Sequence, residues 1–344
     1  MKKFLGIDAG SVSTKFAVVD DHCNVIGTKY LRTQADLVGA IKEGAAWLAD
    51  IVKDQRNIAS AGTTGSGREL AGMLVGADLI KNEITCHAVA AILQRRDVRT
   101  VLEIGGQDSK IIVIRDGVVV DFGMNTICAA GTGSFLEQQC HRMGVPIEEF
   151  GQYALMSNHP ASIAGRCTVF AETDMIHKQQ QGRRIEDIIA GLCQALVRNY
   201  LGTVARGKEI LEPILFQGGV AANIGIVDAF KKSLSMEVVV PAHFREMGAL
   251  GAALLAREHR AQSQTDSAFC GIRSVLAKEF TTEVFVCGEC EEECEMERYV
   301  ENGREIALKG GRCGKWECVA APENRFQTGL ERPVTARPRA PSRL

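Results

Sequence analysis

A strand–turn–strand pattern that occurs twice in the first third of this chain constrains the fold more than any other feature. Residues 4–7 and 15–19 are short apolar runs on either side of Asp-Ala-Gly-Ser, and residues 101–104 and 110–114 repeat the design around Gly-Gly-Gln-Asp-Ser. Such runs with turn residues between them predict β-hairpins. Superposition of the two copies sets Asp8 against Gly105. The repeat predicts an internally duplicated α/β protein with a cleft between its halves.

A third glycine signal lies further along the chain. Residues 213–223 read as a buried strand that ends in Gly218 and Gly219, where a helix begins. Apolar residues at helical spacing predict helices over 35–52 and 185–204, and the small residues of 248–256 predict a helix that packs closely against backbone. The polar stretch 257–268 is expected to be a linker.

Composition excludes several classes of protein. Hydrophobic residues make up 46% and charged residues 24%, as in ordinary soluble globular proteins. The formal net charge of −2 gives no positive field for nucleic acid or an anionic membrane. No apolar run approaches the ~18 residues of a membrane span, and Asp8 falls where a signal peptide would need apolar residues. We expect a cytoplasmic protein without nucleic-acid or membrane partners.

The glycine turns are suited to phosphate binding. Glycine lets backbone N–H groups approach an anion without a Cβ in the way. The turn after Asp8 is followed by hydroxyl side chains and Lys15, and the second turn by Lys110. Asp8 and Asp108 could hold Mg²⁺ directly or through water. Each glycine pair alone could be an ordinary hairpin or helix cap, but three in this order favour a nucleotide site. Neither a Walker A sequence nor a Rossmann fingerprint is present.

These segments resemble a known superfamily. Residues 6–15, 104–110 and 218–223 are similar to the actin, sugar kinase and heat-shock chaperone ATPase superfamily. Within it, Gly-Gly-Gln-Asp-Ser-Lys and residues 125–135 resemble the 2-hydroxyacyl-CoA dehydratase activator family, which also contains activators of benzoyl-CoA reductases. The resemblance covers about residues 1–260. One difference is Glu103, which stands where the family usually has Asp, so its role in holding metal or water stays open.

The resemblance implies an α/β fold of two actin-like (ribonuclease H-like) lobes with ATP in the cleft, plus a small Cys-rich C-terminal module. Lobe I is expected over 1–95 and 246–262, and lobe II, with the cluster cysteines, over 96–245. A linker and the Cys-rich module follow over 263–318, and residues 319–344 form a disordered tail.

The resemblance also implies which residues bind the nucleotide. Asp8 and Asp108 would hold Mg²⁺ and orient water. The expected phosphate contacts are Gly10, Ser11, Ser13, Thr14 and Lys15 of the first turn and Gly105, Gly106, Gln107 and Lys110 of the second. Gly218, Gly219 and Asn223 would line the adenosine pocket.

Cys128 and Cys167 form the decisive pair among twelve cysteines. Each directly precedes an expected helix, and helix N-termini suit a cluster held by thiolates. A [4Fe–4S] cluster needs four thiolates, of which this pair supplies two. The resemblance implies that a twofold homodimer supplies the others and shares one cluster. The alternative is two buried, unligated cysteines.

The C-terminal cysteines predict a second metal site. Cys287, Cys290, Cys294 and Cys313 are the expected ligands, and Cys318 is expected to remain unligated. Their spacing suits an iron–sulfur cluster or zinc, and the choice stays open. The alternative is a set of unligated thiols.

The function implied by the resemblance is ATP-driven one-electron transfer from reduced ferredoxin or flavodoxin to an iron–sulfur dehydratase or reductase. Two alternatives remain. One is a small-molecule kinase of the same superfamily, although no acceptor-binding motif is visible. The other is a regulatory ATPase of this fold with a structural zinc knuckle, which predicts zinc without iron.

Overall fold

Two five-stranded mixed sheets of the same topology form the two lobes, in agreement with the predicted duplicated α/β fold. The computed structural model describes residues 2–52, 57–125 and 129–312. The first sheet has the order β3-β2-β1-β4-β5 and the second β8-β7-β6-β9-β10. In each sheet the first three strands of the lobe pair antiparallel, and the two later strands add in parallel on the other side. The strands are β1 (Lys3–Ala9), β2 (Ser13–Asp20), β3 (Val25–Arg32), β4 (Ile58–Thr64), β5 (Leu79–Ile80), β6 (Thr100–Ile104), β7 (Ser109–Arg115), β8 (Val118–Asn125), β9 (Ile214–Gln217) and β10 (Val238–Val239).

The strand register relates the two hairpins residue by residue. Lys15 lies opposite Asp8, and Lys110 lies opposite Glu103. The turns close in the same way, because Gly10 N–H donates to Ser13 O at 3.1 Å and Gly105 N–H donates to Asp108 O at 3.0 Å. The counterpart of Asp8 is therefore Glu103. The superposition of Asp8 on Gly105 was wrong by two residues, because Gly105 occupies the position of Gly10.

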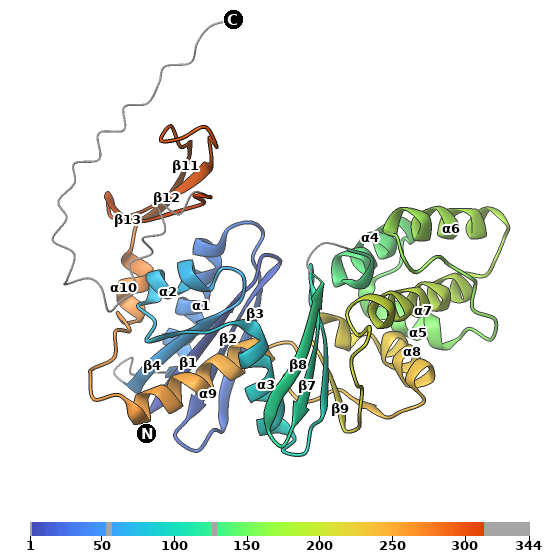
Figure 1. The fold of residues 1–344 in the computed structure, drawn as a ribbon, viewed down its shortest axis with the longest axis horizontal. Coiled ribbons are helices and arrows are strands. Elements are labelled where there is room, and N and C mark those ends of the chain that lie inside the picture. The colour runs from blue at the N-terminus through green and yellow to red at the C-terminus, as the bar shows by residue number, and fades with distance from the viewer. Residues whose placement is uncertain (1, 53–56, 126–128, 313–344) are drawn as a thin grey trace, which may run out of the picture. The chain divides into compact units, whose positions relative to one another are not determined.

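Helices cover the two sheets differently (Figure 1). In lobe I, α1 and α2 pack on the first sheet. In lobe II, α4 to α8 form a larger helical layer, and the edge-to-face rings of Tyr200, Phe216 and Phe230 lie in its core. The helices of the two lobes are α1 (Leu37–Val52), α2 (Arg68–Val75), α3 (Glu83–Gln94), α4 (Gly133–Met143), α5 (Ile147–Leu155), α6 (Thr168–Gln180), α7 (Ile185–Thr203), α8 (Ile224–Leu234) and α9 (Met247–Gln262), with short 3₁₀ turns η2 (Ala129–Gly131) and η3 (Gly219–Ala222).

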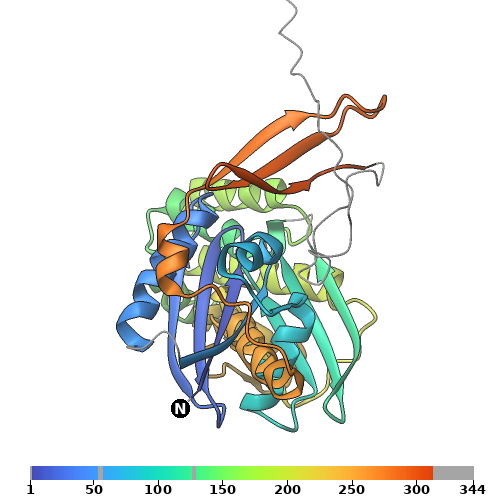
Figure 2. The same ribbon diagram turned by 90° about the vertical axis from the view of Figure 1, so that its left-hand side faces the viewer.

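Helices α3 and α9 pack against each other, and both sheets contribute to the core around them (Figures 1 and 2). A Cβ on Gly6 of β1 would lie 1.9 Å from Ala249 O, and a Cβ on Gly251 would lie 1.9 Å from Cys86 O of α3. Glycine is therefore required for the close approach of α9 to β1 and α3. This confirms the prediction that the small-residue helix packs against backbone.

The chain divides into two compact units, Met1–Leu276 and Ala277–Leu344. Part of the expected linker belongs to the first unit, because α9 extends to Gln262 and the following residues dock on lobe I. Ser267 Oγ and Ala268 N–H donate to the Asp78 carboxylate at 2.7 and 2.6 Å, and Cys270 N–H donates to Val75 O at 3.0 Å. Short helix α10 (Ile272–Ala277) follows.

The second unit holds an antiparallel three-stranded sheet of β11 (Phe280–Val286), β12 (Glu295–Glu301) and β13 (Arg304–Lys309). Its small core consists of Cys287, Cys294 and Met296, against which Phe285 and Leu308 pack. The tail expected over 319–344 lies outside the described residues. Among the described residues, no helix combines the length and apolarity that a membrane crossing requires.

Candidate functional site

A cavity of about 300 Å³ lies where the two lobes face each other. Both hairpin turns, α4, the start of α5 and η3 contribute to its wall. Eight of the residues predicted to bind the nucleotide line it, namely Asp8, Ser13, Lys15, Gly105, Gly106, Gly218, Gly219 and Asn223. The fold thus brings the three glycine signals of the sequence together at one cavity.

The other predicted nucleotide residues lie near the cavity but outside its lining. Ser11 Oγ donates to Gln107 Oε1 at 2.6 Å and so joins the two turns. The Thr14 hydroxyl is buried 2.9 Å from that of Thr33, which donates to Gly10 O. Contacts of these side chains with phosphate stay predictions, as do those of Asp108 and Lys110.

Asp8 and Lys15 form an ion pair at the wall of the cavity. Lys15 Nζ lies 3.1 Å from Asp8 Oδ2, and both side chains are largely buried. Burial alone would raise the pKa of Asp8, but Lys15, His87 and Lys110 more than offset it and hold the pKa below its ordinary value. Asp8 is therefore ionised at neutral pH and available to a cation.

Lys110 holds three carboxylates at the second hairpin. Its Nζ lies 2.6 Å from Glu83, 2.7 Å from Asp108 and 3.2 Å from Glu103, and its side chain is only 2% exposed. Burial raises the pKa of Glu103 to about 7, although Lys110 opposes this. Burial also raises the pKa of Glu83, and the charge of Lys110 again opposes this rise. Three acids share one ammonium group, so this side of the cavity carries excess negative charge.

Glu83 was not predicted from the sequence. Asn82 caps α3 by accepting from Thr85 N–H at 2.9 Å, which places Glu83 in the first helical turn. Asn-Glu-Ile-Thr is a recognisable helix start. However, nothing local to that segment indicates that the carboxylate meets Lys110 of β7.

The glycine corner after β9 can accept a nucleoside. Gly218 has φ +88°, and a Cβ there would lie 2.3 Å from Ile104 O. Asn223 caps α8 through Oδ1, which accepts from Gly225 and Ile226 N–H. Its buried Nδ2 makes no hydrogen bond within residues 2–52, 57–125 and 129–312. A donor without a partner on the cavity wall fits a ligand that supplies an acceptor.

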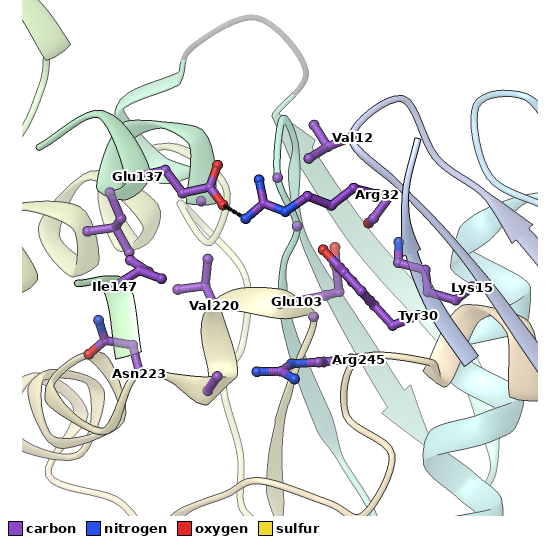
Figure 3. Close-up of a pocket in the computed structure, with 18 of the residues that line it drawn as sticks. Val12, Lys15, Tyr30, Arg32, Glu103, Glu137, Ile147, Val220, Asn223 and Arg245 are labelled. Carbon is purple, nitrogen blue, oxygen red and sulfur yellow. Dashed lines mark hydrogen bonds and ion pairs between the residues drawn. The ribbon is translucent and has the colours of Figure 1, made fainter. Parts of the chain in front are cut away.

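Several lining residues come from segments in which the sequence showed no site (Figure 3). Arg32 at the end of β3 donates to Glu137 of α4 at 3.1 Å, which links the two lobes across the cavity. His87 Nδ1 lies 2.9 Å from Gln217 Nε2, and burial lowers the pKa of His87 to about 4. Tyr30 and Arg245 also line the cavity. Only the folded chain brings these residues together, so local patterns could not reveal them.

Cys167 is the one member of the predicted cluster pair within the described residues, because Cys128 lies outside them. It is the N-cap residue of α6, is half-buried, and makes no capping hydrogen bond through its side chain. Val169 and Phe170 follow it and are each 65% exposed. The thiol therefore lies at a helix N-terminus beside an exposed apolar pair.

Comparison with known proteins identifies the family. A model of the BadF/BadG/BcrA/BcrD ATPase family matches residues 5–256. The chain belongs to this family. It is 32% identical over 259 residues to the (R)-2-hydroxyglutaryl-CoA dehydratase activating ATPase of Acidaminococcus fermentans, which covers 75% of this chain and 98% of that protein.

Two solved structures match the fold. The crystal structure of component A of the A. fermentans (R)-2-hydroxyglutaryl-CoA dehydratase has a TM-score of 0.71 at 32% identity and covers 76% of this chain and 100% of that chain. The activator of the 2-hydroxyisocaproyl-CoA dehydratase from Clostridium difficile with bound ADPNP has a TM-score of 0.70 at 30% identity. This match covers 76% of this chain and 97% of that chain. These matches confirm the actin-like fold, and membership of the family makes this chain an ATPase.

Proposed function

We propose that this BadF/BadG/BcrA/BcrD-family ATPase is an ATP-driven reductive activator. In this proposal, a homodimer shares one [4Fe–4S] cluster through Cys128 and Cys167 of each chain. ATP hydrolysis drives one-electron transfer from reduced ferredoxin or flavodoxin to an iron–sulfur dehydratase or reductase. The relatives named as dehydratase activators support this role.

The cavity supports the nucleotide part of the proposal. The triphosphate would lie between the two hairpin turns, with Lys15 on one side and the backbone of Gly105 and Gly106 on the other. The adenosine would lie against Gly218 and Gly219, where Asn223 Nδ2 offers an unused donor.

The carboxylates fit Mg²⁺. Asp8 is ionised, and Glu103 and Asp108 crowd around Lys110. In the part of the chain that the structure describes, no three acidic, His or Cys side chains are grouped as metal ligands. Mg²⁺ usually takes only one or two carboxylates, together with water and substrate phosphates. Asp8 and Asp108 would hold the ion, which when bound would neutralise phosphate charge, while Lys15 and Lys110 keep the carboxylates oriented.

The position of Cys167 is the observation that carries the cluster assignment. Cys167 is half-buried at the N-terminus of α6, and the partial positive charge and free N–H groups of a helix N-terminus suit a cluster held by cysteine ligands. Val169 and Phe170 supply an exposed apolar contact surface next to it, as a second copy of the chain would require. When bound, the cluster would supply one-electron chemistry, for which two cysteines per chain provide half of the ligands.

Coupling requires that ATP and ADP prefer different arrangements of the lobes. A nucleotide shifts such an equilibrium only by its differential affinity, and about 5.5 kcal/mol moves it from 1:99 to 99:1. For a one-electron couple, each 59 mV corresponds to a tenfold change in the equilibrium constant. A few kcal/mol of coupling between the nucleotide and the cluster would therefore lower the reduction potential of the cluster substantially.

Anaerobic purification tests this proposal. We expect about two iron atoms per chain from the shared cluster and a brown colour that air bleaches. Cys167→Ser should lower the iron content by about two atoms per chain and remove the absorption of the shared cluster, whereas the control Cys270→Ser, a change at an exposed cysteine, should retain both. Wild-type protein without iron, or an unchanged spectrum in Cys167→Ser, would contradict the proposal. ATP turnover that depends on a small hydroxyl compound would instead favour a kinase.

We further propose that the second unit binds a metal through Cys287, Cys290, Cys294 and Cys313. Cys287 and Cys294 are 3% and 5% exposed, and Cys287 N–H donates to Cys294 O at 2.8 Å. Arg312 N–H donates to Cys294 Sγ at 3.3 Å, as backbone amides do around ligating sulfurs. Cys313 lies outside the described residues. Zinc in full-length protein would favour a structural knuckle, and iron beyond the shared cluster would favour a second cluster. Full-length protein that contains no zinc, and no iron beyond the shared cluster, would contradict this part of the proposal.

A further inference from the structure

One turn of α7 hydrogen-bonds to two segments that belong to different parts of the site. Arg198, Asn199 and Tyr200 are consecutive in sequence. Tyr200 binds the nucleotide hairpin, whereas Arg198 and Asn199 bind the segment that leads into Cys167. Most of α7 is buried, so this turn moves with a rigid helix.

The contact of Tyr200 with the hairpin is direct. Its hydroxyl donates to Lys110 O at 2.6 Å, and the side chain is fully buried against Phe230. Burial raises the pKa of Tyr200 well above its ordinary value, so the hydroxyl stays a donor. Lys110 follows the turn of Gly105 to Asp108 by two residues. One hydrogen bond therefore connects the strand that follows this turn directly to α7.

The contacts with the Cys167 segment begin one residue earlier on the helix. Asn199 Nδ2 donates to Gly165 O at 2.7 Å, and Arg198 Nη2 donates to Ile163 O at 2.6 Å. From the other side, Asp174 of α6 accepts from Ala164 N–H at 2.8 Å. The peptide groups between Ile163 and Ala164 and between Gly165 and Arg166, just before Cys167, are thus fixed by α7 and α6.

Two buried polar atoms at this junction, Asn199 Oδ1 and Ser109 Oγ, make no hydrogen bond with any residue that the structure describes. They lie 2.9 and 3.8 Å from the position that a Cβ on Gly131 would take. Ser109 belongs to the nucleotide hairpin, and Gly131 lies two residues before the first residue of α4, so both atoms lie where the hairpin, α7 and the start of α4 meet.

We infer that Tyr200 and Asn199 are positioning residues that transmit the nucleotide state from the second hairpin to the backbone in front of Cys167. A displacement of β7 at Lys110 moves Tyr200, and α7 carries the displacement to the carbonyl of Gly165. This inference rests on the proposed function, in which Cys167 is a cluster ligand. It adds the route by which ATP and ADP reach that ligand.

Hydrogen–deuterium exchange of full-length protein, saturated with ADP or with ADPNP, tests the route. In the wild type we expect exchange of residues 161–167 to differ between the two nucleotides. Tyr200→Phe keeps the ring and removes one hydrogen bond, so the ratio of exchange rates between the two states should fall about fivefold. Tyr153→Phe is the matched control, because Tyr153 packs on the same core without this contact, and it should retain the wild-type ratio.

Asn199→Ala provides a second, independent variant should Tyr200→Phe fail to fold, and it should also reduce the ratio. The inference is overturned if the wild type shows no nucleotide-dependent difference in 161–167, or if the variants match Tyr153→Phe. The rate of iron removal by a chelator, compared between ADP and ADPNP, gives a second readout. Absence of iron in the wild type would refute the proposed function, whereas the exchange experiment would still decide the route.

Discussion

Replacement of Lys110 by Met tests whether the charges around the second hairpin are arranged as described. The side chain of Lys110 is 2% exposed and that of Glu103 is 5% exposed, so their charges interact away from water. Met has a similar volume but no charge, so Lys110→Met would leave Glu83, Glu103 and Asp108 facing one another without a cation. Removal of one partner of a buried ion pair costs about 3–5 kcal/mol. For a unit of this size, that corresponds to a fall in Tm of about 10 °C.

The loss should depend on pH in a defined direction. The pKa of Lys110 is raised, so the stability contributed by its charge is present at neutral pH and is lost only in strong alkali. The pKa of Glu103 is raised to about 7, so the stability gained from its protonation is present at low pH and is lost as pH rises through 7. Without Lys110, the pKa values of Glu103 and Glu83 should rise further. The variant should therefore lose more stability at pH 8 than at pH 5, where these groups can bind protons.

Thermal unfolding of wild type and variant at pH 5 and pH 8 provides the measurement. Lys208→Met is the matched control, because Lys208 pairs with Asp121 at 2.7 Å on the surface. Exposed pairs contribute about 0–1 kcal/mol, so this variant should shift Tm by no more than about 3 °C. A loss in Lys110→Met that is no larger than the control, or is equal at the two pH values, would refute the charge arrangement.

Three further predictions concern the cavity and the packing of α9. The rate of ATP hydrolysis should rise as pH increases through about 7, where Glu103 ionises. In Glu103→Gln, the pH–rate profile should no longer show this rise. Gly6→Ala places a Cβ 1.9 Å from the α9 backbone and should lower Tm, whereas Gly202→Ala, with open space around it, should not. Arg32→Ala should change stability by less than about 1 kcal/mol but speed nucleotide release in stopped-flow measurements, because it removes the link to Glu137.

The sequence was sufficient to predict the duplicated hairpins, the three glycine turns and the helix that packs on backbone. Each of these depends on local patterns: apolar runs, turn residues and small side chains. The comparison of the two hairpins failed by two residues. The register pairs Asp8 with Lys15 and Glu103 with Lys110, so Glu103 corresponds to Asp8 and Gly105 to Gly10. A shift of two residues keeps every side chain on the same face of a strand. The alternation of side chains between the two faces therefore could not reveal the error in the superposition.

The long-range contacts of the site could not be predicted. Glu83 and Lys110 belong to separate elements, α3 and β7, and Arg32 meets Glu137 only across the cavity. The polar residues after α9 were expected to be a linker because their composition is that of a loop. They dock on lobe I because the half-buried carboxylate of Asp78 accepts hydrogen bonds from Ser267 and from the backbone of Ala268. Composition alone does not show such a partner.

The two hairpins of the site have the same backbone arrangement but differ in charge, and in the proposed function this difference would make the two lobes respond differently to the nucleotide. In lobe I, Asp8 has one lysine to itself, whereas in lobe II three carboxylates compete for Lys110. A cation brought by the nucleotide would relieve more repulsion on the lobe II side, so the second hairpin should respond more strongly to the nucleotide. That hairpin also contacts the rest of lobe II, through Tyr200 of α7 and through Gly106 O, which accepts from Ser134 of α4 at 2.6 Å. Among the described residues, the first hairpin packs instead on α1, α2 and α9. In the proposed function, the duplication would supply two similar clamps for phosphate, and the divergence of their side chains would direct the response toward Cys167.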